Sequence, residues 1–462
     1  MKVAGVYKIH EDIETIEEVI RGLDEPLGLE CILAVAQGQG HEVDLFIPKD
    51  TKDMEEIIAF NPNIILYSST TNRIDFYLKF NKELKKIKSN LISIVGGYHP
   101  SAEPSIIKEG FDFAILGEGE ETFRELLTSI EKNKDYEKIK GIAFLGEGIV
   151  VNPRRQRIEN LDKLPDPFRT EKIFKQKSTY LSYPPTKKRK TAFLEYSRGC
   201  TFNCSFCASP NVLGRKIIYR KPETITRQLK NLKENFGINY IFFTDLNMTL
   251  NPKKVEELCD SLIQENLNIY WTILSGFRNI SYGLLKKMKQ AGCVKISWGL
   301  ENILQPPWIK KETKKLCPSN KIQEILNYSS EIGILSETFL IIGWPKETRE
   351  QIKETMNRLP YYNIHIASFP IYTPFPGTLD HKIIREKGFL IEKDKSKYDV
   401  NHLVFNHPCF SGNELKEIQG EMSRTFYFSE EYKKRISKFI KKHPRYKKIF
   451  DEFLSLVYKK LK

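Results

Sequence analysis

The chain has 462 residues and is 40 % hydrophobic, which is typical of a folded protein with two or three domains. No apolar run reaches the length of a membrane span, and the first residues form a strand-like run without a signal-peptide pattern, so we expect a cytoplasmic location. Eight cysteines are too few and too scattered for a disulfide framework. The net charge of +14 comes mostly from lysines spread along helical segments, which favours a solvated surface over a nucleic-acid interface.

Strand-like and helical patterns alternate up to about residue 145. The strand-like runs cover 3–7, 43–47, 64–68, 91–95 and 111–116, and the helical patterns cover 29–37, 54–60, 74–88 and 120–132. This alternation predicts an α/β domain with a doubly wound, Rossmann-like parallel sheet. Three strand ends are polar or rich in glycine: Ser68-Ser69-Thr70, Gly96-Gly97-Tyr98 and Gly117-Glu118. Ligands of such sheets bind beyond the carboxyl ends of the strands, so these turns are candidate binding residues.

Residues 146–190 carry a strand or two and then the stretch Leu164-Pro165-Asp166-Pro167. Proline cannot occupy the interior of regular structure, so this segment is predicted to be a linker.

Three cysteines follow the strand-like run 191–196 with the spacing C-x3-C-x2-C: Cys200, Cys204 and Cys207. They cannot all form disulfides, because three is an odd number and short loops strain the bond. They can surround one soft metal centre. A zinc ion would need a fourth ligand, whereas an iron–sulfur cube held by three thiolates keeps one iron open.

Strand–helix units continue to about residue 380. Strand-like runs cover 240–245, 269–274, 295–299, 337–342 and 365–372, and helical patterns begin at 222, 252, 282, 321 and 349. This repetition predicts a parallel barrel or partial barrel with its chemistry at the carboxyl ends of the strands. Asp245, Arg278, Glu301 and Gly343 follow such strand ends. From residue 381 the pattern changes to basic amphipathic helices, which predict a small helical C-terminal region.

The cysteine stretch, with Phe206 before its last cysteine, resembles the signature of the radical S-adenosylmethionine (SAM) enzymes. The stretches 299–302 (GLEN), 342–348 (IGWPKET) and 373–378 (TPFPGT) resemble later turns of the same core, although asparagine replaces the usual serine in the first. The strand-end turns of the first domain resemble the cobalamin-binding domain that precedes many such cores. The resemblance implies a cobalamin-binding-type domain over 1–145, a linker over 146–190, a partial (β/α)6 TIM-type barrel over 191–380 and a helical C-terminal domain over 381–462.

The resemblance also implies site residues. Cys200, Cys204 and Cys207 would hold a [4Fe-4S] cluster whose open iron is chelated by SAM. The implied SAM contacts are Phe206, Asp245, Arg278, Glu301 and Gly343, and the implied cobalamin contacts are Ser68, Ser69, Thr70, Gly96, Gly97, Tyr98, Gly117 and Glu118. The D-x-H-x-x-G motif of other cobalamin proteins is absent, and His10 and His41 lack its context, so no histidine of that motif is expected below the cobalt.

The activity that the resemblance implies is methylation of an unreactive carbon in a small-molecule or biosynthetic-intermediate substrate. One SAM methylates cobalt, a second supplies the radical, and an electron donor such as flavodoxin or ferredoxin reduces the cluster. Three alternatives stay open: cyclisation or rearrangement without methyl transfer, a tRNA methylthiotransferase, and a non-catalytic, metal-stabilised nucleic-acid-binding protein. The single cysteine of the N-terminal domain, Cys31, argues against the second, and the repeated strand-end motifs argue against the third.

Overall fold

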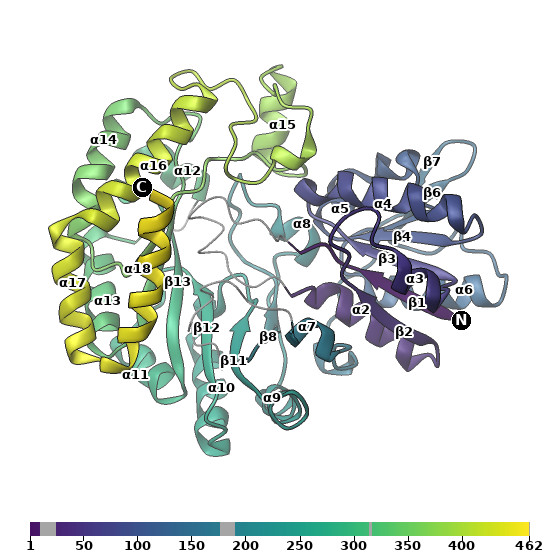
Figure 1. Ribbon diagram of the computed structural model, residues 1–462, viewed down its shortest axis with the longest axis horizontal. Coiled ribbons are helices and arrows are strands. Elements are labelled where there is room, and N and C mark those ends of the chain that lie inside the picture. Colours follow the sequence, from purple (N-terminus) through teal and green to yellow (C-terminus); the bar gives the residue numbers. More distant parts are fainter. Residues whose placement is uncertain (10–24, 176–189, 314–316, 462) are drawn as a thin grey trace.

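The computed structural model describes residues 1–9, 25–175, 190–313 and 317–461. Within these ranges the chain forms an N-terminal sheet of seven strands and a second sheet of six strands, which lie side by side (Figure 1). A short antiparallel ribbon of β9 (Ser197–Arg198) and β10 (Ile218–Tyr219) flanks the cysteine loop.

The N-terminal sheet has the strand order β2-β1-β3-β4-β5-β6-β7. Its strands are β1 (Lys2–Val6), β2 (Glu42–Phe46), β3 (Ile64–Ser68), β4 (Ile92–Gly96), β5 (Phe113–Ile115), β6 (Ile142–Leu145) and β7 (Ile149–Val151). The first five strands are parallel, and β6 and β7 are antiparallel additions at one edge. The order 2-1-3-4-5 is that of flavodoxin-like folds, in which ligands bind at the carboxyl ends of the strands near the switch between β1 and β3. Because β7 belongs to this sheet, the sheet extends beyond residue 145 into the predicted linker.

Helices cover both faces of this sheet, which confirms the doubly wound prediction. They are α2 (Leu27–Gly38), α3 (Glu55–Phe60), α4 (Ile74–Ile87), α5 (Tyr98–Ala102) and α6 (Glu120–Glu131). Apolar side chains of α2 and α6 pack in one hydrophobic cluster, and those of α3 and α4 pack in another on the opposite face. The strands are therefore apolar on both sides, as parallel strands between two helical layers must be.

The second sheet is entirely parallel, with the order β15-β14-β13-β12-β11-β8. Its strands are β8 (Lys190–Leu194), β11 (Ile238–Phe243), β12 (Tyr270–Ser275), β13 (Cys293–Glu301), β14 (Leu335–Leu340) and β15 (Ile366–Ser368). The connecting helices are α8 (Ser209–Leu213), α9 (Pro222–Phe236), α10 (Pro252–Glu265), α11 (Tyr282–Gln290), α12 (Pro307–Thr313), α13 (Ser319–Glu331) and α14 (Arg349–Arg358). Six strands in sequence order with β8 and β15 at the edges make the predicted partial barrel. The strand predicted over 365–372 is shorter than expected, because Pro370 has no N–H to continue the ladder.

The C-terminal region is helical, as predicted. It contains α15 (Leu379–Glu386), α16 (Gly412–Phe428), α17 (Glu430–Lys442) and α18 (Lys447–Leu461). The last three helices share one hydrophobic core with the barrel, and the Tyr427 hydroxyl donates a 2.7 Å hydrogen bond to the Ala367 carbonyl of β15. They therefore cover the β15 edge of the barrel rather than forming a separate body.

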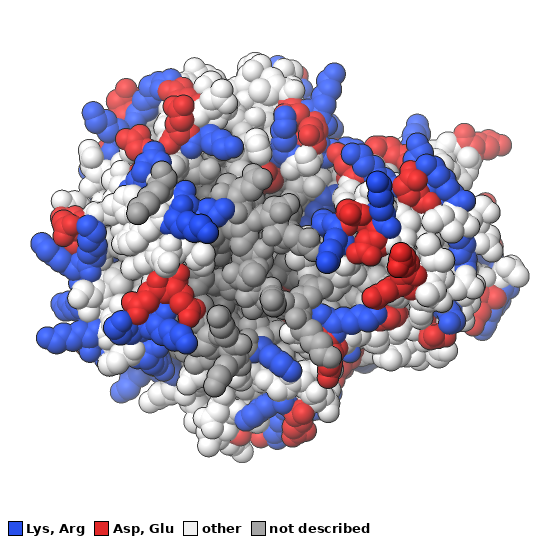
Figure 2. Space-filling model, viewed as in Figure 1, with Lys and Arg blue, Asp and Glu red and all other residues white. Residues whose placement is uncertain are grey.

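Charged side chains of both signs are interspersed over much of the face in Figure 2, and Lys and Arg are dense over α17 at its left edge. None of the described helices is long and apolar enough to cross a membrane.

Candidate active site

The three cysteines of the C-x3-C-x2-C stretch share one apolar cluster at the carboxyl ends of β8 and β11. Its members are Cys200, Phe202, Cys204, Phe206, Cys207, Leu246 and Leu250. Cys200 and Cys204 are buried and Cys207 is half-buried. All eight cysteines, each within the described ranges, carry thiols that are not in disulfides. The loop thus presents two buried thiols and one half-buried thiol in apolar surroundings.

The donor set fits an iron–sulfur cluster better than a single metal ion. Three soft thiols lie together in one loop, which suits soft iron centres. The Cys204 thiol donates to the carbonyl oxygen of Thr313 at 3.2 Å. A four-iron cube is much larger than one ion, so its thiolates lie farther apart than zinc ligands do. Soft thiol donors without a nearby fourth ligand are what such a cube requires when one iron stays open.

The cysteine loop is anchored at both ends. Gly199 has φ +106°, and a Cβ there would lie 2.3 Å from the carbonyl oxygen of Lys216, so only glycine fits where the loop begins. Near its end, Ser205 Oγ lies 2.7 Å from a carboxylate oxygen of Glu312 in α12 and 2.9 Å from one of Asp380 in α15. Residues distant in sequence therefore fix the path of the loop.

Asp245, just beyond β11, lies beneath the start of this loop. Its carboxylate accepts hydrogen bonds from the Tyr196 backbone N–H at 3.0 Å and from Ser197 Oγ at 2.5 Å. Burial raises the pKa of Asp245 to about 7, although these hydrogen bonds oppose the shift. The structure therefore places this predicted SAM contact where it orients the cysteine loop.

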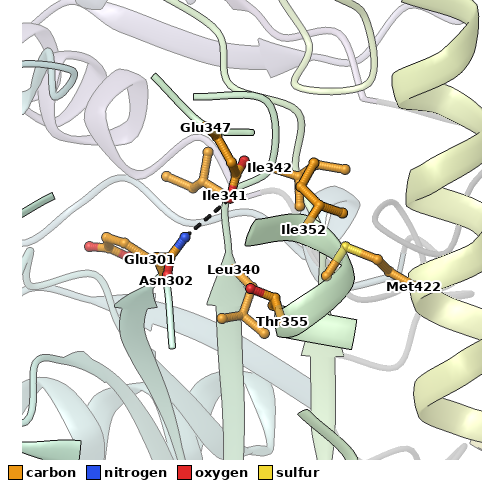
Figure 3. Close-up of a pocket in the computed structure, with 9 residues that line it drawn as sticks. All are labelled: Glu301, Asn302, Leu340, Ile341, Ile342, Glu347, Ile352, Thr355 and Met422. Atoms are coloured by element: carbon orange, nitrogen blue, oxygen red, sulfur yellow. Dashed lines mark hydrogen bonds between the residues drawn. The ribbon is translucent and has the colours of Figure 1, made fainter. Parts of the chain in front are cut away.

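The turns after β13 and β14 meet around a small pocket (Figure 3). It is lined by Glu301, Asn302, Leu340, Ile341, Ile342, Glu347, Ile352, Thr355 and Met422. Asn302 Nδ2 donates to Glu347 Oε1 at 3.1 Å, and Glu347 Oε2 accepts the Gly343 N–H at 2.8 Å. Burial raises the pKa of Glu347 to about 8 against the opposing effect of these bonds. The structure brings together the predicted residues Glu301 and Gly343, and it adds Asn302 and Glu347, which the sequence interpretation did not assign.

Phe206 packs against the β14 turn. Its ring meets the ring of Trp344 edge to face, with the centroids 5.1 Å apart. Gly343, with φ +73°, lies so close to α16 that a Cβ would approach Leu415 Cδ1 to 2.7 Å. Through Phe206 the cysteine loop packs against the turn after β14, and through Gly343 this turn packs against α16.

Arg278 behaves differently from the other predicted SAM contacts. Its side chain is exposed in the turn after β12, and it does not line the pocket of Figure 3. Its role in SAM binding stays a prediction.

The predicted cobalamin contacts lie on neighbouring turns at the ends of β3, β4 and β5. The Ser69 N–H donates to the Gly96 carbonyl at 2.8 Å, and Gly97, with φ +101°, has no room for a Cβ beside Ser69. Gly96 and Gly117 differ from Gly97, because the nearest atoms to a Cβ at either position are 3.9 Å away. Neighbouring side chains therefore do not close off the backbone at these two glycines, and the residues present are compatible with cobalamin.

Tyr98 and Glu118 belong to these turns but also face the second domain. Burial raises the pKa of Tyr98. A hydrogen bond with Ser209 opposes this rise, and the nearby Cys207 adds to it. The Glu118 carboxylate accepts a 3.0 Å hydrogen bond from the Ile158 N–H and contacts Arg198 at 3.4 Å. The edge of the sheet that carries the candidate cobalamin turns is therefore also the edge that meets the cysteine loop.

Two described histidines of the N-terminal domain, His41 and His99, lie in different surroundings. His41 Nδ1 lies 3.2 Å from the amino group of Met1, at the amino end of the sheet and away from the candidate cobalamin turns. His10 lies outside the described residues. His99 is buried, contacts Thr71 Oγ1 through Nδ1 at 3.2 Å and has its pKa lowered to about 4 by burial, so its imidazole is neutral.

The fold and the site define a class of protein with two domains. In this class the strand ends of a flavodoxin-like domain face a partial barrel that carries the three-cysteine loop. The Radical SAM superfamily model matches residues 194–359, and the B12 binding domain model matches residues 15–127. The chain is a radical SAM enzyme with an N-terminal B12-binding domain. These two domains imply a [4Fe-4S] cluster, SAM and cobalamin as cofactors.

Known proteins resemble the chain over most of its length. "Uncharacterized methyltransferase PH0819" of Pyrococcus horikoshii is 28 % identical over 444 residues, which cover 92 % of this chain and 93 % of the relative. The anaerobic magnesium-protoporphyrin IX monomethyl ester cyclase of Rubrivivax gelatinosus is 25 % identical over 443 residues, 92 % of this chain and 77 % of the relative. The structure of the cobalamin-dependent SAM radical enzyme OxsB with aqua-cobalamin and SAM bound superposes with a TM-score of 0.72 at 16 % identity, covering 94 % of this chain and 70 % of that one. This last likeness shows a shared fold.

Proposed function

We propose that this protein is a cobalamin-dependent radical SAM methyltransferase that transfers a methyl group to an unreactive carbon of a small molecule. The observation that carries the proposal is the position of the open glycines Gly96 and Gly117, on the sheet edge that meets the loop of Cys200, Cys204 and Cys207. A cobalamin on those turns and a cluster on that loop would face the same space. The similarity to a relative named as a methyltransferase over 92 % of the chain supports the same reading.

The three cysteines of the loop would hold the cluster, and the turns around Gly96 and Gly117 would hold cobalamin. When bound, the cluster with SAM supplies hydrogen abstraction from an unreactive carbon, and cobalamin supplies the methyl group. The chain's own residues orient these groups: Asp245 fixes the start of the cysteine loop, and Asn302 with Glu347 fixes the strand-end turns. The apolar side chains around the thiols would limit the access of water to the cluster.

The proposed domain division is the predicted one, 1–145 for cobalamin, 146–190 as a connection, 191–380 for the radical SAM core and 381–462 as a helical cover, with the first domain extended to Val151 because β7 belongs to its sheet. We also propose a one-electron donor such as flavodoxin or ferredoxin as a partner, because the cluster must be reduced before it acts. A reducing compartment such as the cytoplasm suits the thiols of the loop.

Cyclisation without methyl transfer is the second candidate. It is favoured by the similarity to the Rubrivivax gelatinosus cyclase, which also extends over 92 % of this chain. The two candidates differ in whether SAM gives up its methyl group.

Anaerobic reconstitution tests the proposal. The protein is incubated with iron, sulfide and cobalamin, and unbound cofactors are removed. Its iron and cobalt contents are then measured. We expect roughly four iron atoms per chain, as a [4Fe-4S] cluster requires, together with equimolar cobalt. Iron without retained cobalt would contradict the methyltransferase and favour cobalamin-free cyclisation.

A further inference from the structure

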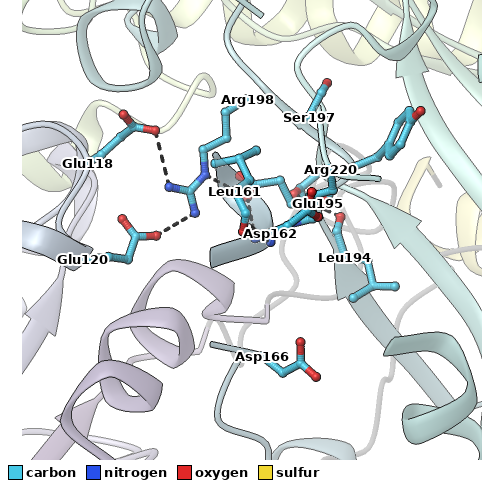
Figure 4. A network of polar contacts seen from close by, with 12 residues as sticks. Glu118, Glu120, Leu161, Asp162, Asp166, Leu194, Glu195, Ser197, Arg198 and Arg220 are labelled. Atoms are coloured by element: carbon cyan, nitrogen blue, oxygen red, sulfur yellow. Dashed lines mark hydrogen bonds and ion pairs between the residues drawn. The ribbon is translucent and has the colours of Figure 1, made fainter. Parts of the chain in front are cut away.

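Arg198, two residues before Cys200, is buried between the two domains with its side chain only 6 % exposed. Its guanidinium contacts Glu120 at 2.6 Å, Glu195 at 2.8 Å and Glu118 at 3.4 Å (Figure 4). Glu118 lies in the turn after β5 of the B12-binding domain and Glu120 is the first residue of α6, whereas Glu195 follows β8 of the barrel. One arginine thus binds carboxylates of both domains.

Two further arginines complete this group, which we call the interdomain arginine network. Its members are Arg157, Arg198, Arg220, Glu118, Glu120 and Glu195. Arg157 Nε lies 3.3 Å from Glu118, and Arg220 Nη2 lies 3.6 Å from Glu195. Three positive and three negative side chains balance one another, which buried charges require. Burial raises the pKa of Glu120, but Arg198, a backbone hydrogen bond and Arg220 together lower it below its usual value, so the carboxylate stays ionised.

Arg157 also fits into the cysteine loop itself. A Cβ on Gly214 would lie 2.4 Å from Arg157 Cδ, and a Cβ on Gly199 would lie 3.1 Å from Arg157 Nη1. Arg157 donates a hydrogen bond to the carbonyl oxygen of Lys216. Because Gly199 and Gly214 have no side chains, the side chain of Arg157 can pack between them. A residue of the connecting segment therefore contacts the cysteine loop directly.

The network therefore joins two short pieces of chain. Glu118 directly follows Gly117, one of the two open glycines, and Arg198 precedes Cys200 by one glycine. We propose that Arg198 is a positioning residue that fixes the spacing between the cobalamin turn and the cluster loop, an inference that rests on the proposed function. Such spacing matters because two reactive groups that share one substrate need a near-contact geometry, and small displacements lower the rate steeply.

The test measures that spacing directly. Cob(II)alamin and the reduced cluster each carry unpaired spin, so pulsed electron paramagnetic resonance on the doubly loaded protein reports their dipolar coupling. The variants are Arg198→Lys, which keeps the charge but loses the forked donor geometry, and Glu120→Gln, which removes one partner from the other domain. The control is Lys85→Met, which breaks the ion pair of Lys85 with Asp112 inside the B12-binding domain.

We expect one narrow coupling in the wild type and in the control, and a broadened or shifted coupling in Arg198→Lys and Glu120→Gln with iron and cobalt contents retained. Unchanged coupling in both variants would overturn the inference. Loss of iron in Arg198→Lys with unchanged coupling in Glu120→Gln would also overturn it, because Arg198 would then support only the cysteine loop. If Arg198→Lys does not fold, Glu120→Gln and Glu118→Gln decide by the same criterion. A wild-type protein that retains no cobalamin would instead contradict the proposed function, and the inference would fall with it.

Discussion

Asn302 Nδ2 donates a 3.1 Å hydrogen bond to Glu347 Oε1, and this bond joins the turn after β13 to the turn after β14. Both side chains are buried, and the same asparagine accepts a 2.8 Å hydrogen bond from the Leu304 N–H through Oδ1. Asn302 occupies the position where the radical SAM resemblance leads one to expect serine. In this chain the longer amide reaches a carboxylate that is itself held by the Gly343 N–H.

Replacing Asn302 with alanine should lower the free energy of unfolding by about 1–3 kcal/mol, because it leaves a buried oxygen of Glu347 without this donor. Urea denaturation measures the loss. The matched control is Asn235→Ala on the exposed face of α9, for which we expect a change within about 0.5 kcal/mol. Equal effects of the two substitutions would show that the Asn302–Glu347 bond contributes nothing.

The raised pKa of Asp245 predicts a pH-dependent stability. The pKa is about 7 in the folded protein against an ordinary 3.8, so the folded state holds the proton more tightly. The stabilisation is complete below about pH 4 and is lost as the pH rises through 7. Between pH 4 and pH 8 the free energy of unfolding of the wild type should fall, relative to that of Asp245→Asn, by on the order of a few kcal/mol. Parallel stability profiles of the two proteins between pH 4 and pH 8 would contradict the assignment.

Replacing Cys204 with alanine should reduce bound iron to background and abolish SAM cleavage, because two thiolates do not hold the cluster. Iron analysis and chromatography of the SAM products measure both effects. Cys409→Ala is the control, because this half-buried cysteine lies outside the apolar cluster of Cys200, Cys204 and Cys207. We expect the iron content of this variant to match that of the wild type. Wild-type SAM cleavage by Cys204→Ala would refute the cluster assignment.

Alanine at Gly199 should displace the cysteine loop. Its φ of +106° disfavours any side chain, and the Cβ would collide with the Lys216 carbonyl, so we expect a cost of about 1–3 kcal/mol and weaker retention of iron. Gly28→Ala provides the comparison, because a Cβ on that helical glycine would have no other atoms within 4 Å, and the position should tolerate alanine. Wild-type iron retention and stability in Gly199→Ala would show that the loop does not need glycine there.

The strand–helix order was predictable from sequence because local patterns determine it. Runs such as Ile238–Phe243 are apolar on both faces, and helices separate them at short intervals. The strands β6 and β7 were not predictable as part of the first sheet. The turn between them contains Gly146 and Gly148, and such a glycine-rich stretch looks like a loop in sequence.

The cysteine loop could be recognised from its spacing alone, but its surroundings could not. Arg198 and Glu120 are 78 residues apart, and neither lies in a pattern that reveals the other. The same holds for Asn302 and Glu347, which are 45 residues apart. Contacts of this kind depend on how two domains or two turns pack, and only the folded chain specifies them.

The most direct test of the central claim measures S-adenosylhomocysteine after the reconstituted protein is incubated anaerobically with SAM and a strong reductant. Loss of the methyl group from SAM leaves this product, whereas reductive cleavage alone leaves methionine and 5′-deoxyadenosine. A methyltransferase of the proposed kind should form S-adenosylhomocysteine when cobalamin is loaded and not when it is omitted. Formation of 5′-deoxyadenosine alone, with cobalamin bound, would contradict methyl transfer through cobalamin.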